Sequence, residues 1–128
     1  SGGEQQLVAL AKVTAKKPSL LLLDEPTKGL DRASVLTLAK TLKAIRADND
    51  MTIVCVTHDA EFAAYTADSC ALFFDGRIIS RSDRTDFLTD SRFYTTAAAA
   101  MSRGILDGCT TVGEICACLR ESEGGGAE

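Results

Sequence analysis

Two adjacent carboxylates, Asp24 and Glu25, follow directly on an unbroken run of four leucines at residues 20–23. Such a run is typical of a strand buried in a parallel sheet, and the acids then lie at the carboxyl edge of that sheet, where α/β proteins bind ligands. A pair of acids at this edge indicates a site that binds a metal ion and catalyses a reaction. The alternative is that both acids cap a turn before Pro26.

A second candidate is the block Ser1, Gly2 and Gly3, which precedes a segment with helical periodicity. The two glycines allow backbone N–H groups to approach an anion closely, and a helix that begins there directs its positive dipole end the same way. Ser1 adds a hydroxyl donor. A plain helix cap would use the same residues.

The third candidate is His58, the only histidine of the chain, which follows a β-branched strand expected over residues 52–57. Histidine titrates near neutral pH and suits proton transfer or phosphate contact. Taken alone, a single histidine at the end of a strand is more often structural.

These three blocks, residues 1–6, 20–27 and 57–59, resemble in order and spacing the signature, acidic-strand and histidine motifs of the ATP-binding cassette ATPases. The phosphate-loop pattern G-x-x-x-x-G-K-[ST] does not occur in the sequence. The resemblance therefore implies the C-terminal half of a nucleotide-binding domain, and the start at Ser1 is expected to be a boundary of the available sequence.

The resemblance implies ATP and Mg²⁺ as cofactors and gives a role to each acid. Asp24 would hold Mg²⁺, through water because this ion dehydrates reluctantly. Glu25 would orient or deprotonate the attacking water. His58 would contact the γ-phosphate.

The resemblance also implies a composite site shared by two cassettes. The signature block would bind the γ-phosphate of the nucleotide held by the opposite subunit, and its residues are Ser1, Gly2, Gly3, Glu4 and Gln5. Asp31 would be the acid of a loop that crosses the dimer interface. Asp31 can also cap the helix that follows, and both roles are compatible.

The second half of the chain resembles a narrower group, the ATPases of energy-coupling factor importers for vitamins or transition-metal ions. Residues 57–64, 74–78 and 93–98 carry this likeness, although Ala99 and Ala100 stand where the group has a polar pair. The alternative for the last of these segments is an alanine-rich helix that packs on the domain.

The composition fits a compact protein, with 45% hydrophobic residues and a net charge of -4. Fourteen basic residues are scattered among eighteen acids, which argues against a nucleic-acid surface. No apolar run approaches the roughly 18 residues that span a bilayer. The five cysteines are odd in number and lie in apolar segments, so we expect reduced thiols in a core rather than a disulfide framework or a metal site at Cys116 and Cys118.

The alternation of helix and strand predicts an α/β fold. The resemblance implies a partial three-layer P-loop NTPase fold, whose mostly parallel sheet lacks the phosphate-loop strand. A C-terminal hairpin and a helical tail would follow the sheet. Residues 1–90 would form the nucleotide-binding part, residues 91–123 a helical extension and residues 124–128 a disordered tail. Residues 20–24 would pair in parallel with residues 52–56. Residues 71–74 would lie beyond a gap or pair with residues 77–79 alone. Because the phosphate-loop strand is missing, five residues are expected to be exposed: Ile53, Val54, Val56, Leu72 and Phe73.

We interpret the chain as part of the ATP-hydrolysing subunit of a membrane importer, placed peripherally at the cytoplasmic face of the membrane. Its expected partners are a second cassette and a transmembrane coupling protein, with no nucleic acid. The fragment itself, without a phosphate loop, would be inactive. The alternatives are a cassette ATPase of DNA repair, chromosomes or ribosomes, and a cassette kept only as an interaction module.

Overall fold

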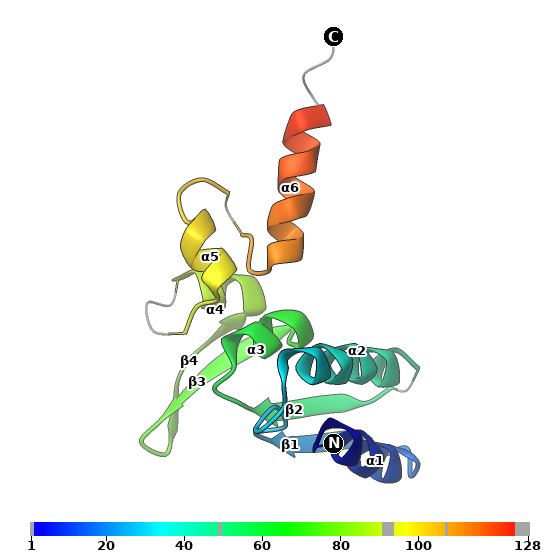
Figure 1. Cartoon of the computed structure of the whole chain (residues 1–128). Coiled ribbons are helices and arrows are strands. Elements are labelled where there is room, and N and C mark those ends of the chain that lie inside the picture. The colour runs from blue at the N-terminus through cyan, green and yellow to red at the C-terminus, as the bar shows by residue number, and fades with distance from the viewer. Residues whose placement is uncertain (1, 49, 91–93, 107, 125–128) are drawn as a thin grey trace. The chain divides into compact units, whose positions relative to one another are not determined.

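The computed structural model describes residues 2–48, 50–90, 94–106 and 108–124. The chain divides into two compact units, residues 1–62 and residues 63–128, and each is described by itself (Figure 1). Among the described residues, no helix combines the length and hydropathy needed to cross a bilayer.

The first unit contains a two-stranded parallel sheet with helices before and between its strands. Helix α1 (Gly2–Thr14) leads to strand β1 (Leu20–Asp24), and helix α2 (Arg32–Asp48) connects β1 to strand β2 (Thr52–Val56). The two strands pair in parallel and in register from Leu20 opposite Thr52 to Asp24 opposite Val56. The predicted parallel pairing of these two segments is confirmed.

One face of this sheet belongs to the core of the first unit. Successive side chains of a strand point to opposite faces, so Leu21 and its partner Ile53 share one face. Leu21 is buried and Ile53 half-buried. Helix α2 supplies the largest share of the other buried side chains, at the helical spacing that the sequence predicts: Val35, Leu38, Ala39 and Leu42.

The opposite face of the sheet is uncovered. Leu22 is 68% exposed and Val56 61% exposed, and Leu20 and Val54 lie on the same face with about half of their surface open. Parallel strands are normally covered on both faces, which is why they are apolar throughout. An open apolar face on a parallel sheet therefore indicates that a further layer packs on it.

The second unit is built on a β-hairpin. Helix α3 (Ala60–Thr66), which begins in the first unit, leads to strand β3 (Ser69–Phe74), and β3 pairs antiparallel with strand β4 (Arg77–Asp83). Asp75 and Gly76 form the connection with positive φ angles of 46° and 74°, as a two-residue hairpin turn requires. Among the described strands, β3 and β4 pair only with each other, which agrees with the second of the two predicted arrangements, a hairpin that pairs alone.

Three of the five residues expected to be exposed are so, and two are not. Val54, Val56 and Phe73 are 48%, 61% and 69% exposed. Ile53 and Leu72 are only half-buried rather than open, so this part of the prediction is wrong. The physical reason is strand alternation: each of the two points to the opposite side of its sheet from its exposed neighbours.

Three helices follow the hairpin: α4 (Arg84–Asp90), α5 (Ala97–Ser102) and α6 (Val112–Gly124). Helix α5 is the alanine-rich segment, and its Ala98 and Ala99 are 2% exposed. It contacts both α4 and α6. Part of the expected extension, residues 91–93, and residues 125–128 of the expected tail lie outside the described residues.

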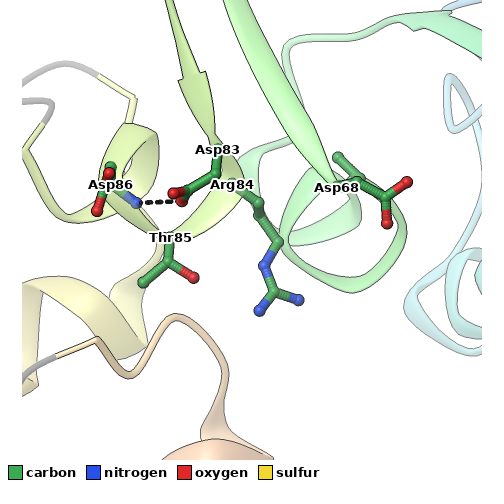
Figure 2. A pocket seen from close by; sticks show the side chains of 6 residues that line it. Asp68, Asp83, Arg84, Thr85 and Asp86 are labelled. Atoms are coloured by element: carbon green, nitrogen blue, oxygen red, sulfur yellow. Dashed lines mark hydrogen bonds between the residues drawn. The ribbon is translucent and has the colours of Figure 1, made fainter.

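A pocket of about 560 Å³ lies beside the start of α4 (Figure 2). Its polar side chains serve the fold. Asp83 caps α4 by accepting a hydrogen bond from the Asp86 amide at 3.0 Å. The negative charge of Asp83 is the main cause of a raised pKa at Asp86. Arg84 donates to the Ala64 carbonyl at 2.9 Å and to Glu114 Oε1 at 3.1 Å.

Helix α6 begins with a capping box. The Glu114 amide donates to Thr111 Oγ1 at 3.2 Å, and the Thr111 amide donates back to Glu114 Oε2 at 2.9 Å. Thr110 adds two further donors to the same oxygen, its amide at 2.7 Å and its hydroxyl at 2.9 Å. With Arg84 on its other oxygen, Glu114 connects α4, α6 and the loop before α6.

Replacement of the Glu114 carboxylate should cause a pH-dependent loss of stability. Partial burial opposes ionisation of Glu114, but the hydrogen bonds from Thr110 and Thr111 and the charge of Arg84 outweigh it and lower its pKa below the ordinary 4.5. A depressed folded-state pKa stabilises the fold above the unfolded pKa, and this stabilisation disappears as the pH falls through the folded pKa. Glu114→Gln should cost about 1 kcal/mol at about pH 7, because a cap is weakened while the side chain stays partly solvated.

Thermal unfolding between about pH 7 and about pH 3 checks this expectation. The difference between the unmodified chain and Glu114→Gln should shrink as the pH falls below about 4.5. Glu121→Gln, an exposed change on the same helix, is the matched control and should leave the unfolding temperature unchanged. A Glu114→Gln deficit that stays constant over the whole range would contradict the role of the charge.

Candidate active site

Glu25 and His58 come together at the carboxyl end of the β1–β2 sheet. Nδ1 of His58 lies 2.8 Å from Oε2 of Glu25. The histidine side chain is 76% exposed, whereas the glutamate side chain is 29% exposed. Glu25 Oε2 itself is shielded from solvent, and apart from this contact with His58 it makes no hydrogen bond to a described residue. A carboxylate held against an exposed imidazole is an arrangement suited to proton transfer.

The backbone of Glu25 has a conformation that a glutamate rarely adopts. Its φ angle is +44°, in the left-handed region that favours glycine. The conformation is held by the Glu25 amide, which donates to the Val56 carbonyl at 2.8 Å and thereby extends the pairing of the two strands by one residue. Backbone strain of this kind concentrates at functional sites, and among the described acids only Glu25 and Asp75, which lies in the hairpin turn, have such an angle.

His58 is positioned by the residues on either side of it. Thr57 Oγ1 accepts a hydrogen bond from the Asp59 amide at 3.1 Å, and Asp59 Oδ1 accepts from the Phe62 amide at 2.9 Å. Asp59 thus caps α3, while Thr57 closes the turn between β2 and that helix. The turn fixes the backbone that carries His58 toward Glu25.

Asp24 lies at the end of β1 on the uncovered face of the sheet, since it alternates with Leu23 and shares the face of Leu22. The electrostatic effect of the two acids is visible at Cys55 in the next strand. Burial, followed by the charges of Glu25 and Asp24, raises the pKa of the Cys55 thiol to about 11. Cys55 therefore stays protonated and is no nucleophile.

The glycine block forms the first turn of α1, and this helix lies close to α2. Gly2, Gly3, Glu4 and Gln5 are in that turn, whereas Ser1 lies outside the described residues. A Cβ on Gly3 would come within 2.7 Å of Ser34 Oγ. Gly3 is thus required for the close approach of α1 to α2, in addition to any role toward an anion.

Asp31 caps α2, one of the two roles expected for it. Its Oδ1 accepts from the Ser34 amide at 2.9 Å, and its Oδ2 accepts from the Ser34 hydroxyl at 3.0 Å. The backbone and side-chain hydrogen bonds from Ser34 lower the pKa of Asp31. The role of Asp31 at an interface between cassettes stays a prediction.

Two residues that were not expected as site residues connect the signature block to other segments. Gln6 Nε2 donates to the Pro26 carbonyl at 3.0 Å, which ties α1 to the loop that follows the acids. Ser34 binds Asp31 and lies against Gly3. In the sequence, Gln6 is only a polar residue on the inner side of α1, and Ser34 is only a small residue three positions after a helix cap. Neither residue indicates by itself which partner it contacts.

Comparison with known proteins gives one family. The family model described as ABC transporter matches residues 1–28. A putative ABC transporter ATP-binding protein of Bacillus thuringiensis is 45% identical over 97 residues, which cover 76% of this chain and 17% of the relative. The cobalt import ATP-binding protein CbiO of Rhodobacter capsulatus is 46% identical over 90 residues, which cover 70% of this chain and 32% of the relative.

A solved structure agrees with the sequence relatives. The structure of cbiO1 from Clostridium perfringens, described as part of the ABC transporter complex cbiONQ, has a TM-score of 0.67 and 27% identity and covers 82% of this chain and 40% of that one. The chain belongs to the ATP-binding cassette ATPases. The predicted α/β cassette fold is thereby confirmed, and the chain spans 17% to 32% of the length of these two curated relatives.

The cassette residues present fit a magnesium ion that is shared with a nucleotide. Among the described residues, no group of three or more His, Cys, Asp or Glu side chains could hold a metal by itself. Mg²⁺ is typically held by one or two carboxylates, with phosphate oxygens and water in the remaining positions. Asp24, at the end of β1 on the open face of the sheet, supplies one such carboxylate.

Proposed function

We propose that this chain is the C-terminal part of the ATP-hydrolysing subunit of a membrane importer, at the cytoplasmic face of the membrane. The observation that carries the hydrolytic part is the 2.8 Å approach of His58 Nδ1 to Glu25 Oε2 at the carboxyl edge of a parallel sheet. A segment that precedes this sequence would supply the phosphate loop, and its strand would pair with an open backbone edge of the β1–β2 sheet.

In this mechanism Glu25 is the general base. Its carboxylate would accept a proton from the attacking water, and a positioned base of this kind accelerates a reaction by about 10²- to 10⁴-fold. His58 would keep the carboxylate oriented through Nδ1 and direct the other side of its ring at the γ-phosphate. Mg²⁺, held by Asp24 through water, would neutralise charge on the phosphates when ATP is bound.

The signature turn of α1 would act on a second nucleotide. Amides of Gly2 and Gly3 at the start of a 13-residue helix are suited to an anion, and the helix dipole adds to their effect. Because α1 is tied to the acidic loop through Gln6, the amides and Glu25 would move together. A second cassette would then complete each site, with Asp31 at the contact between them.

The importer is proposed to be of the energy-coupling factor type. The 46% identity with the cobalt import protein CbiO of Rhodobacter capsulatus supports this class, as does the order of motifs in residues 57–98. A transition-metal ion or a vitamin would be the transported substrate, and a transmembrane coupling protein would be the membrane partner.

Replacement of His58 tests the hydrolytic part. In the complete protein, His58→Ala should lower steady-state phosphate release by at least about tenfold, because a group that stabilises the developing charge is removed. The affinity for ATP should change much less, since the phosphate loop provides most of the binding contacts. A loss of nucleotide binding of the same size as the loss of turnover would instead make His58 a structural residue.

Transport is tested by uptake of labelled Co²⁺ or a labelled vitamin into vesicles that contain the complete protein and the membrane proteins encoded beside it. We expect ATP-dependent uptake with the unmodified protein and a matching loss with His58→Ala. ATP hydrolysis without uptake of any such substrate would favour a cassette ATPase of DNA repair, chromosomes or ribosomes. Absence of both would favour an interaction module.

A further inference from the structure

Two cysteine side chains meet in the second unit of the molecule. Cys109 lies in the loop before α6 and is 3% exposed, while Cys118 lies within α6 and is half-buried. Their Sγ atoms are 3.4 Å apart. A disulfide has an S–S distance of about 2.05 Å, so a small change of side-chain torsion would bring the two sulfurs to bonding distance.

The backbone carbonyls of Cys109 and Thr110 are held by side chains of α5 and its cap. Ser102 Oγ donates to the Cys109 carbonyl at 3.3 Å, and Thr96 Oγ1 donates to the Thr110 carbonyl at 2.6 Å. Cys118 is carried by α6, whose first turn is fixed by the capping box. The approach of the two sulfurs is therefore set by ordered backbone from two segments and does not depend on a mobile end of the chain.

The third cysteine of this region is a natural control. Cys116 is exposed and lies two residues before Cys118 on the same helix. Residues two apart on a helix face different directions, so Cys116 and Cys118 cannot both face Cys109. The structure thus selects one pairing out of the three that these cysteines allow.

We propose that Cys109 and Cys118 form a reversible dithiol–disulfide pair that is oxidised by small-molecule disulfides. Disulfides in reducing compartments are typically transient and redox-sensing, so this pair would be reduced at rest. Closing the bond would join α6 to the loop before it through a ten-residue ring, 109–118, and restrict the motion of that helix. The site uses none of the residues proposed for ATP hydrolysis.

The reaction proceeds by two exchanges. The hydrogen bond with Cys118, then burial, raise the pKa of the Cys109 thiol to about 11, so Cys109 is not the first group to react. The Cys118 thiolate attacks one sulfur of the small disulfide and releases the first small thiolate. Cys109 then loses its proton and attacks Cys118 Sγ, which releases the second. The two protein thiols are oxidised, the small disulfide is reduced to two thiols, and the released thiolates take up the two protons.

Oxidation with glutathione disulfide followed by peptide mapping tests the proposal. Under native conditions Cys109 and Cys118 should both lose their thiols without retaining glutathione, and digestion with trypsin and a glutamate-specific protease should give residues 104–114 joined to residues 115–120. The same crosslink should form in Cys116→Ser and be absent from Cys118→Ser. Dithiothreitol should restore both thiols.

The same oxidation in concentrated urea provides the reference. There the three pairings among Cys109, Cys116 and Cys118 should form in a mixture, including a bond inside residues 115–120. Under native conditions we expect at least about tenfold preference for the Cys109–Cys118 bond, because geometry decides whether a disulfide closes. A native product mixture equal to that in urea, or free or separately glutathionylated Cys109 and Cys118, would refute the pair and leave core packing as their role.

Discussion

Replacing Glu25 by glutamine in the complete protein should lower ATP turnover by at least about a hundredfold while ATP is still bound, because the shape of the side chain remains and its ability to take a proton is lost. The geometry supports a large effect. Glu25 Oε2 is shielded from water, so little solvent is available to replace it as a base. Its +44° φ angle also shows a backbone arranged around this one side chain.

Phosphate release and ATP binding are measured on the same preparations. Glu121→Gln, the same chemical change at an exposed position of α6, should keep the turnover of the unmodified protein. If Glu25→Gln retained turnover within a few-fold of the unmodified protein, Glu25 would not be the base.

The second large effect concerns the chain of residues 1–128 by itself. It should show no ATP hydrolysis and no affinity for ATP in the micromolar range, since the amides and the lysine of a phosphate loop provide most triphosphate contacts and the sequence contains no such loop. The remaining groups are the first turn of α1, the two acids and His58, which would touch two different nucleotides.

Calorimetric titration of the purified chain with Mg-ATP measures this directly. A flat titration is expected up to millimolar nucleotide. Stoichiometric binding at micromolar concentration would mean that the described residues form a complete nucleotide site, and the need for an upstream segment would disappear.

Elements with local signals could be predicted from the sequence. The Asp75-Gly76 pair specified the hairpin because both positions need positive φ angles. The Thr111–Glu114 pair specified the start of α6, since the two side chains cap each other within one turn. The pairing of residues 20–24 with residues 52–56 followed from the order of strands in the family.

The contacts that assemble the site could not be predicted in this way. The approach of Gly3 to Ser34 and the bond from Gln6 to Pro26 join residues that are 31 and 20 positions apart, and nothing in their immediate neighbours specifies a partner. The left-handed backbone of Glu25 is held by Val56, a residue of another strand. Such features depend on the packed tertiary structure, and local propensity disfavours the last of them.

A kinetic cycle on Glu25 and His58 tests most directly the claim that the two act as one unit. ATP turnover of the complete protein is measured for Glu25→Gln, His58→Ala and the double variant. Because His58 Nδ1 lies 2.8 Å from Glu25 Oε2, removal of either partner should remove most of what the other contributes. Cooperation between the two residues predicts a double variant with a turnover within about threefold of that of Glu25→Gln alone. A double variant in which the two single losses multiply would show that the residues act independently and would contradict it.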